Sequence, residues 1–150
     1  MEPERPGAVL FACTLNAVRS PMAAALLQHL IGRGVRVASA GVRAGRCDPY
    51  VMAVMDEIGI DVSEHEPRSL AELGDETFDL IITLSPEAHH HALELTRTMS
   101  ADVEYWPTLD ATVSAAGITR LEAAARYRKV RDDLAAKIKL RFAIEGGPTV

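Results

Sequence analysis

One cysteine and one arginine, six positions apart, carry the strongest chemical signal in this sequence. Cys13 opens a short stretch that ends with Arg19 and Ser20. A cysteine thiolate is a nucleophile, and the planar fork of an arginine side chain can bind two oxygens of a phosphate at once. Together, Cys13 and Arg19 favour a site that holds a phosphate-like oxyanion next to the sulfur.

The segments on both sides of this stretch predict how it is held. Residues 8–12 are apolar and rich in β-formers, which indicates a buried strand. Residues 21–31 begin with a proline and contain strong helix formers. A loop between a strand and a helix N-terminus points its N–H groups and the positive end of the helix dipole towards an anion. Although a free cysteine is usually a small buried hydrophobic residue, this setting favours a phosphate-binding loop over residues 13–20.

Strands and helices alternate along the rest of the chain. Helices are expected to start at Asp48-Pro49 and at Ser85-Pro86, where a capping residue precedes a proline. Such alternation predicts an α/β fold, in which a parallel sheet is covered by helices on both faces and binds ligands at the carboxyl ends of its strands. Apolar runs predict further strands at 35–39, 78–84 and 103–106, and residues 60–69 and 108–117 are expected to be loops. The last helix is expected from about residue 118, with an inward-facing stripe of Tyr127, Val130, Leu134, Ile138 and Phe142.

Length and composition limit the possibilities further. The 150 residues, 48% of them hydrophobic, are enough for one domain over 1–150, with residues 1–7 as a frayed tail. The net charge of −5 and the scattered basic residues argue against nucleic acid or a membrane surface as the partner. Two cysteines, with no signal peptide and no long apolar run, predict a cytoplasmic protein with a free thiol at Cys13.

Several motifs resemble those of the low-molecular-weight protein tyrosine phosphatases, a family that shares its fold with the thioredoxin-coupled arsenate reductases. The resemblance is carried by residues 9–23, by Ser39-Ala40-Gly41, by Asp48-Pro49 and by residues 79–83. It implies a three-layer α/β/α fold with a four-stranded parallel sheet in the flavodoxin-like order 2-1-3-4. It also implies a phosphomonoester hydrolase that forms a cysteinyl-phosphate intermediate on Cys13 and binds the phosphate through Arg19.

The resemblance assigns further residues to the site. Asp110 corresponds to the family's general acid and base, and Asn16 and Ser39 to a pair that shapes the loop. Ser20 either donates a hydrogen bond to the thiolate or caps the following helix, and both roles remain open. The implied substrate is a phosphotyrosine protein or a small aryl phosphate, phosphate or sulfate is expected to occupy the loop, and neither a cofactor nor a metal is implied. The substrate-binding residues are expected to be Thr14, Leu15, Asn16, Ala17, Val18, Ser20 and Ser39.

The sequence departs from the family pattern in the loops around the site. Leu15 stands in place of a usual glycine, Val18 in place of a common second cysteine, and Ala111 in place of the proline after the acid. No aromatic residue lies in residues 42–48 and no tyrosine follows Asp110 directly, although such residues normally form the walls of the slot for an aryl group. Tyr50 either substitutes for them or packs its own helix.

Two other functions are compatible with the same loop. An arsenate reductase needs further cysteines to relay a disulfide, and residues 84–99 contain none, which leaves only Cys47. A non-catalytic phosphate-binding module would bind the oxyanion without hydrolysis.

The remaining polar clusters are expected to be structural. His89, His90 and His91 point in different directions on a helix, which predicts a solvated face rather than a zinc site. His65 falls where the family has a histidine before its third strand, Trp106 is expected to anchor the core, and residues 126–131 to form a charged helix face.

Overall fold

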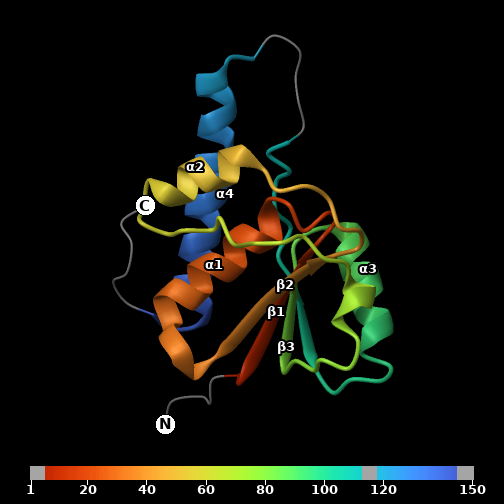
Figure 1. The fold of residues 1–150 in the computed structure, drawn as a ribbon. Coiled ribbons are helices and arrows are strands. Elements are labelled where there is room, and N and C mark those ends of the chain that lie inside the picture. The colour runs from red at the N-terminus through yellow and green to blue at the C-terminus, as the bar shows by residue number, and fades with distance from the viewer. Residues whose placement is uncertain (1–5, 113–117, 145–150) are drawn as a thin grey trace.

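A computed structural model describes residues 6–112 and 118–144, and its centre is a four-stranded parallel sheet (Figure 1). The strands follow the order β2-β1-β3-β4, which confirms the predicted α/β fold and the order 2-1-3-4. All six residues of β1 are buried, as expected for an apolar strand with neighbours on both sides. The strands are β1 (Ala8–Cys13), β2 (Arg36–Gly41), β3 (Leu80–Thr83) and β4 (Asp102–Tyr105).

Helices cover both faces of this sheet and complete the three layers. In Figure 1, α1, α2 and α4 lie on one side of the sheet and α3 lies on the other. The helices are α1 (Arg19–Ile31), α2 (Pro49–Asp56), α3 (Pro86–Leu95) and α4 (Arg120–Arg141), and two short 3-10 helices are η1 (Gly32–Gly34) and η2 (Leu70–Leu73).

The two sides of β1 belong to two different hydrophobic cores. Because side chains alternate along a strand, Val9, Phe11 and Cys13 face the layer of α1, α2 and α4, and the residues between them face α3. The inward stripe predicted for the last helix is confirmed, since its members Tyr127 to Phe142 are all buried in the first of these cores. Cys13 therefore ends a strand at the core beneath α1.

The helix starts follow the predicted capping residues in α2 and α3. The Asp48 side chain accepts a hydrogen bond from the Tyr50 amide, and the Ser85 side chain accepts one from the Ala88 amide. The first helix begins earlier than predicted, at Arg19 rather than at residue 21. The last helix begins at Arg120, two residues later than expected.

Some predicted surface segments are more firmly held than expected. Arg131, placed on a charged helix face, is only 6% exposed and donates to the Val54 carbonyl and to Glu57, so that prediction is wrong at this position. The Gly7 carbonyl accepts from the Arg36 amide, so Gly7 is held beside the start of β2. Residues 1–5 and 113–117 of the predicted tail and loop lie outside the described residues, and residues 108–112 form an irregular loop as expected.

The histidine run and Trp106 also have definite partners. His89 is half-buried rather than solvated, because its Nδ1 is 2.9 Å from the Thr83 hydroxyl and its ring stacks on Tyr105. Trp106 packs edge-to-face on Phe11 with ring centroids 6.1 Å apart, in agreement with a role as a core anchor.

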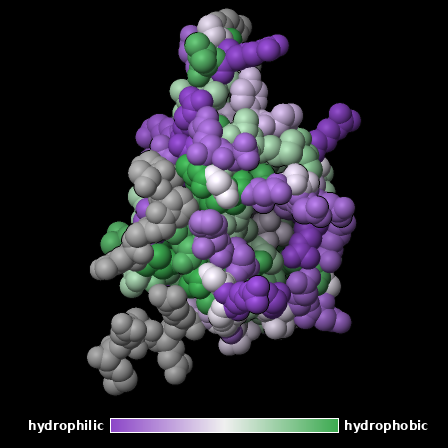
Figure 2. All heavy atoms as spheres, turned by 60° about the vertical axis from the view of Figure 1, so that its left-hand side comes forward, coloured by the Kyte–Doolittle hydropathy of each residue, from purple (hydrophilic) through white to green (hydrophobic). Residues whose placement is uncertain are grey.

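On the side turned forward in Figure 2, apolar side chains lie near the middle, with hydrophilic ones above them and to their right. Of the helices in the described ranges, none combines the length and the apolar character needed to cross a membrane.

Candidate active site

Cys13 lies at the carboxyl end of β1, directly before the loop that leads into α1. Its side chain is 2% exposed, and its Sγ lies 2.8 Å from the Ser20 hydroxyl oxygen. The Ser20 amide also donates to this sulfur, at 3.4 Å. The N-cap of α1 is Val18 and has no side-chain capping bond, so Ser20 lies inside the first turn and does not cap the helix. Of the two roles left open for Ser20, the geometry supports the contact with sulfur.

Asn16 holds the loop from behind. It is fully buried and has a positive φ of 53°, a left-handed conformation that asparagine tolerates better than most residues. Its side-chain amide donates to the hydroxyls of Ser20 and Ser39, each at 2.9 Å. Its side-chain oxygen accepts from the Arg68 amide, and its main-chain oxygen lies 2.9 Å from His65 Nε2. The loop therefore keeps a strained shape because four neighbours hold Asn16.

Glycines let the segment after β2 run alongside this loop. A Cβ on Gly41 would lie 2.6 Å from the Asn16 amide nitrogen and 2.6 Å from the Arg43 carbonyl oxygen, so only glycine fits there. A Cβ on Gly45 would lie 3.0 Å from the Leu15 Cβ. The departure at Leu15 is thus accommodated by a glycine opposite it, and the Leu15 side chain is 44% exposed at the rim of the site.

A cavity of about 100 Å³ opens above Cys13 and brings the three predicted catalytic residues together. Asn16, Ser20 and Ser39, which were expected to bind substrate, are not part of its lining; they lie behind the loop and support it. The lining residues are Cys13, Thr14, Leu15, Ala17, Val18, Arg19, Asp110 and Thr112.

Arg19 reaches this cavity from the first turn of α1. Its guanidinium donates to the Thr108 carbonyl at 3.2 Å and to the Thr14 hydroxyl at 3.4 Å. The Thr14 hydroxyl in turn donates to the hydroxyl of Ser85, the N-cap of α3. One contact lies at the upper end of the usual range for hydrogen bonds and the other beyond it, so the Arg19 donors are held loosely and are available to an oxyanion.

Asp110 faces the cavity from the loop after β4. Its Oδ1 accepts from the Thr112 hydroxyl at 2.6 Å and from the Thr112 amide at 2.9 Å. Burial raises the pKa of the Asp110 carboxyl, but the hydrogen bonds from Thr112 and the charge of Arg19 outweigh it, so the pKa lies below its ordinary value. The site without substrate therefore favours the ionised form of Asp110.

Several residues of the site were missed or left without a role by sequence reasoning. Arg68 contacts Asn16 and Thr112 contacts Asp110, and no local pattern marks either residue. Ser85 was predicted only as a helix cap, and it also contacts Thr14. His65 was marked only by its position before the third strand, and its contact with Asn16 gives it a role. A larger hollow of about 550 Å³ lies behind Ser39 and His65, whereas Cys13, Arg19 and Asp110 line the smaller cavity.

The described residues hold no cluster of three or more histidine, cysteine, aspartate or glutamate side chains that could bind a metal ion. Both cysteines are free thiols, with Cys13 buried and Cys47 exposed.

The sequence that contains this strand, loop and helix matches a known family. The family model described as low molecular weight phosphotyrosine protein phosphatase matches residues 8–139. The chain belongs to this family.

Named relatives within the fold differ in activity. The arsenate reductase of Halalkalibacterium halodurans is 32% identical over 133 residues, which cover 87% of this chain and 91% of that protein. The YwlE arginine phosphatase of Geobacillus stearothermophilus has a TM-score of 0.70 and 25% identity, and covers 92% of this chain and 95% of its own. The tyrosine phosphatase Wzb of Escherichia coli K30, solved in complex with sulphate, shares the fold with a TM-score of 0.69 and 19% identity, over 93% of this chain and 97% of that chain.

Proposed function

We propose that this protein hydrolyses phosphomonoesters through a cysteinyl-phosphate intermediate on Cys13. The observation that carries the proposal is the single cavity shared by Cys13, Arg19 and Asp110. A nucleophile, a cation for the phosphoryl oxygens and a carboxyl group for the leaving oxygen are the parts that phosphoryl transfer through cysteine requires.

Cys13 and Arg19 each have one task in the proposed reaction, and Asp110 has two. The Cys13 thiolate attacks phosphorus, the S–P bond forms, and the bond from phosphorus to the ester oxygen breaks. The protonated Asp110 gives its proton to the departing oxygen, and Arg19 binds the oxygens of the phosphoryl group during transfer. Asp110 then takes a proton from a water molecule that attacks phosphorus, the S–P bond breaks, and inorganic phosphate and the thiolate are released.

The contacts around Cys13 and Asp110 support these roles. The Ser20 hydroxyl and amide face the sulfur and stabilise its anionic form. The low pKa of Asp110 favours the base needed in the second half of the reaction. Since the first half needs the protonated acid, we expect turnover of esters with poor leaving groups to fall as the pH rises from acidic to neutral.

Variants at the two reacting residues test the proposal. With p-nitrophenyl phosphate, Cys13→Ser should lower kcat/KM at least about 1,000-fold. With phenyl phosphate, whose leaving group is poorer, Asp110→Asn should lower kcat about 100-fold, while Asp75→Asn on an exposed loop serves as the matched control. A wild-type protein as inert as Cys13→Ser would exclude catalysis and favour a phosphate-binding module.

Arsenate reduction is the second candidate, because the relative from Halalkalibacterium halodurans is named an arsenate reductase. Reduction of arsenate to arsenite takes two electrons, which two thiols supply when they form a disulfide. Cys47 is the only other cysteine in the chain, and its thiol donates to the His65 carbonyl at the surface. If reduction is relayed through this thiol, arsenate turnover with thioredoxin should be lost in Cys47→Ser. Phosphatase activity should persist in the same variant.

A further inference from the structure

A second hollow adjoins the catalytic cavity on the side of the general acid. It has a volume of about 460 Å³ and lies between the start of α2 and the first turns of α4. Thr112 lines both this groove and the catalytic cavity, so the two meet beside Asp110. Because the general acid must contact the leaving oxygen, the body of the leaving group extends from Asp110 towards this groove.

Two tyrosines form an aromatic wall of the groove. Tyr50 on α2 and Tyr127 on α4 stack with ring centroids 5.0 Å apart and planes 23° apart. The Tyr127 hydroxyl donates to Asp48 at 2.6 Å, and the same carboxylate accepts from the Tyr50 amide. Tyr127 is therefore anchored, and it supports the half-buried Tyr50 from behind. The aromatic surface that residues 42–48 lack is supplied here by two helices.

One cation lines the groove at its surface. Arg46 is exposed, and no carboxylate in the described part of the chain forms an ion pair with it. Arg43, three residues earlier, is paired with Glu87. The Asp48 carboxylate accepts hydrogen bonds from Tyr50 and Tyr127. Arg46 is therefore the charged side chain of the groove that is available to a ligand.

We propose that the groove binds the leaving group of the substrate, an aryl phosphate that carries an anionic group on the far side of the ring. The ring packs on Tyr50, and Arg46 binds the anionic group. This inference rests on the proposed phosphatase function and specifies the substrate class of the same site. Phosphotyrosine beside an acidic residue and a small carboxylated aryl phosphate share this chemistry.

Matched substrate pairs distinguish a phosphoprotein substrate from a small aryl phosphate. The small pair is 4-carboxyphenyl phosphate and its neutral amide, 4-carbamoylphenyl phosphate; the peptide pair is one phosphotyrosine peptide with glutamate or glutamine beside the phosphotyrosine. We expect kcat/KM to favour the anionic member about three- to tenfold, mainly through KM. A preference in the peptide pair alone identifies a phosphoprotein substrate, and one in the small pair alone identifies a small metabolite.

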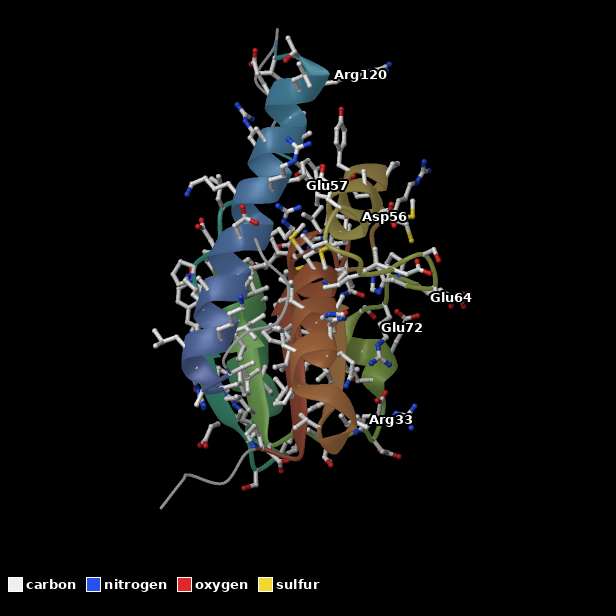
Figure 3. The ribbon with its side chains drawn as sticks, turned by 90° about the vertical axis from the view of Figure 1, so that its left-hand side faces the viewer. Arg33, Asp56, Glu57, Glu64, Glu72 and Arg120 are labelled. Atoms are coloured by element: carbon white, nitrogen blue, oxygen red, sulfur yellow. The ribbon has the colours of Figure 1, made fainter. Side chains whose placement is uncertain are left out.

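Variants locate the source of the preference. Arg46→Gln should abolish it by raising KM for the anionic member. Arg33→Gln is the control and should retain it, because it removes the same charge at the opposite end of the molecule from Arg120, which begins the helix beside the groove (Figure 3). Tyr50→Ala should lower kcat/KM about tenfold for every aryl substrate. Tyr50→Phe keeps the ring and should retain the preference for the anionic member, and thermal unfolding shows whether each variant is folded.

Binding to Cys13→Ser gives a readout that does not depend on turnover. Calorimetry of the same two peptides should show tighter binding of the acidic one, and Arg46→Gln should remove the difference. Equal affinity and equal kcat/KM for both members of both pairs would overturn the inference while leaving a phosphatase intact. Preferential binding with no hydrolysis by the wild type would instead overturn the proposed function and leave the groove's specificity standing.

Discussion

Arg19 and Arg131 carry the same charge but lie in opposite surroundings. Arg131 is buried between α2 and α4, and its guanidinium donates to the Val54 carbonyl, Glu57 and Asp132 at 2.7 to 2.8 Å. Arg19 lines the catalytic cavity, and its guanidinium makes contacts of only 3.2 and 3.4 Å with a carbonyl and a hydroxyl. An arginine whose donors are saturated within the protein stabilises the fold, and one with loosely held donors beside a cavity is available to an anion.

The largest expected effect is on catalysis and comes from Arg19. Arg19→Lys keeps the charge but removes the planar fork, so kcat/KM for p-nitrophenyl phosphate should fall about 100- to 1,000-fold. The free energy of unfolding should change by less than about 0.5 kcal/mol, since the replaced contacts are long. Steady-state kinetics and urea unfolding measure both quantities. If Arg19→Lys keeps kcat/KM close to that of the wild type, the donors of Arg19 do not bind the phosphoryl group as proposed.

Arg131 should show the reverse pattern. Arg131→Met removes a buried cation with three acceptors, so the free energy of unfolding should fall by about 2–3 kcal/mol. Because Arg131 does not line the cavity, kcat per folded molecule should stay within about twofold of the wild type. Urea unfolding combined with active-site titration at 25 °C separates the two effects. A loss of kcat in fully folded protein would contradict the division of roles.

A smaller effect is expected at Ser39, which supports the loop through one hydrogen bond from Asn16. Ser39→Ala leaves the Asn16 side-chain amide one acceptor short behind the loop. The loss of one hydrogen bond costs about 1 kcal/mol, which corresponds to a fall in kcat/KM of about fivefold. Ser63→Ala, on an exposed loop, is the control and should leave kcat/KM unchanged. If both serine variants behave alike, the bond to Ser39 does not position the loop.

The smallest expected effect concerns acid stability. Glu57 lies between α2 and α4 (Figure 3), where hydrogen bonds from Arg128 and then Arg131 lower its pKa to about 2, despite an opposing contribution from burial. Because folding lowers this pKa, the stabilisation is complete above the ordinary value near 4.5 and is lost as the pH falls towards 2. The Glu57→Gln variant should therefore lose less stability than the wild type between pH 5 and 3. If the free energies of unfolding of the wild type and of Glu57→Gln fall equally over this range, Glu57 does not contribute to the acid sensitivity.

The sheet order was implied by the family resemblance, and the other parts of the fold that were predicted correctly depend on neighbours in sequence. The apolar run of β1, the Pro-initiated helices and the stripe from Tyr127 to Phe142 are encoded by local periodicity and caps. Arg131 was placed wrongly because it lies in a polar run, and its burial depends on the packing of α2 on α4. His89 was misplaced for the same reason, since Thr83 and Tyr105 lie on other elements.

The chain by itself determined that a thiol and a guanidinium meet in a strand–loop–helix turn, because residues 13–19 are close in sequence and the loop is too short to separate them. The resemblance had assigned Asp110 to the site and Ser39 to a pair with Asn16, but only the tertiary structure decided that His65 and Arg68 also hold Asn16 and that Tyr50 and Tyr127 form one wall. These contacts join residues from different elements. Their positions follow from the sheet order and the packing of α2 against α4, which sequence patterns do not specify.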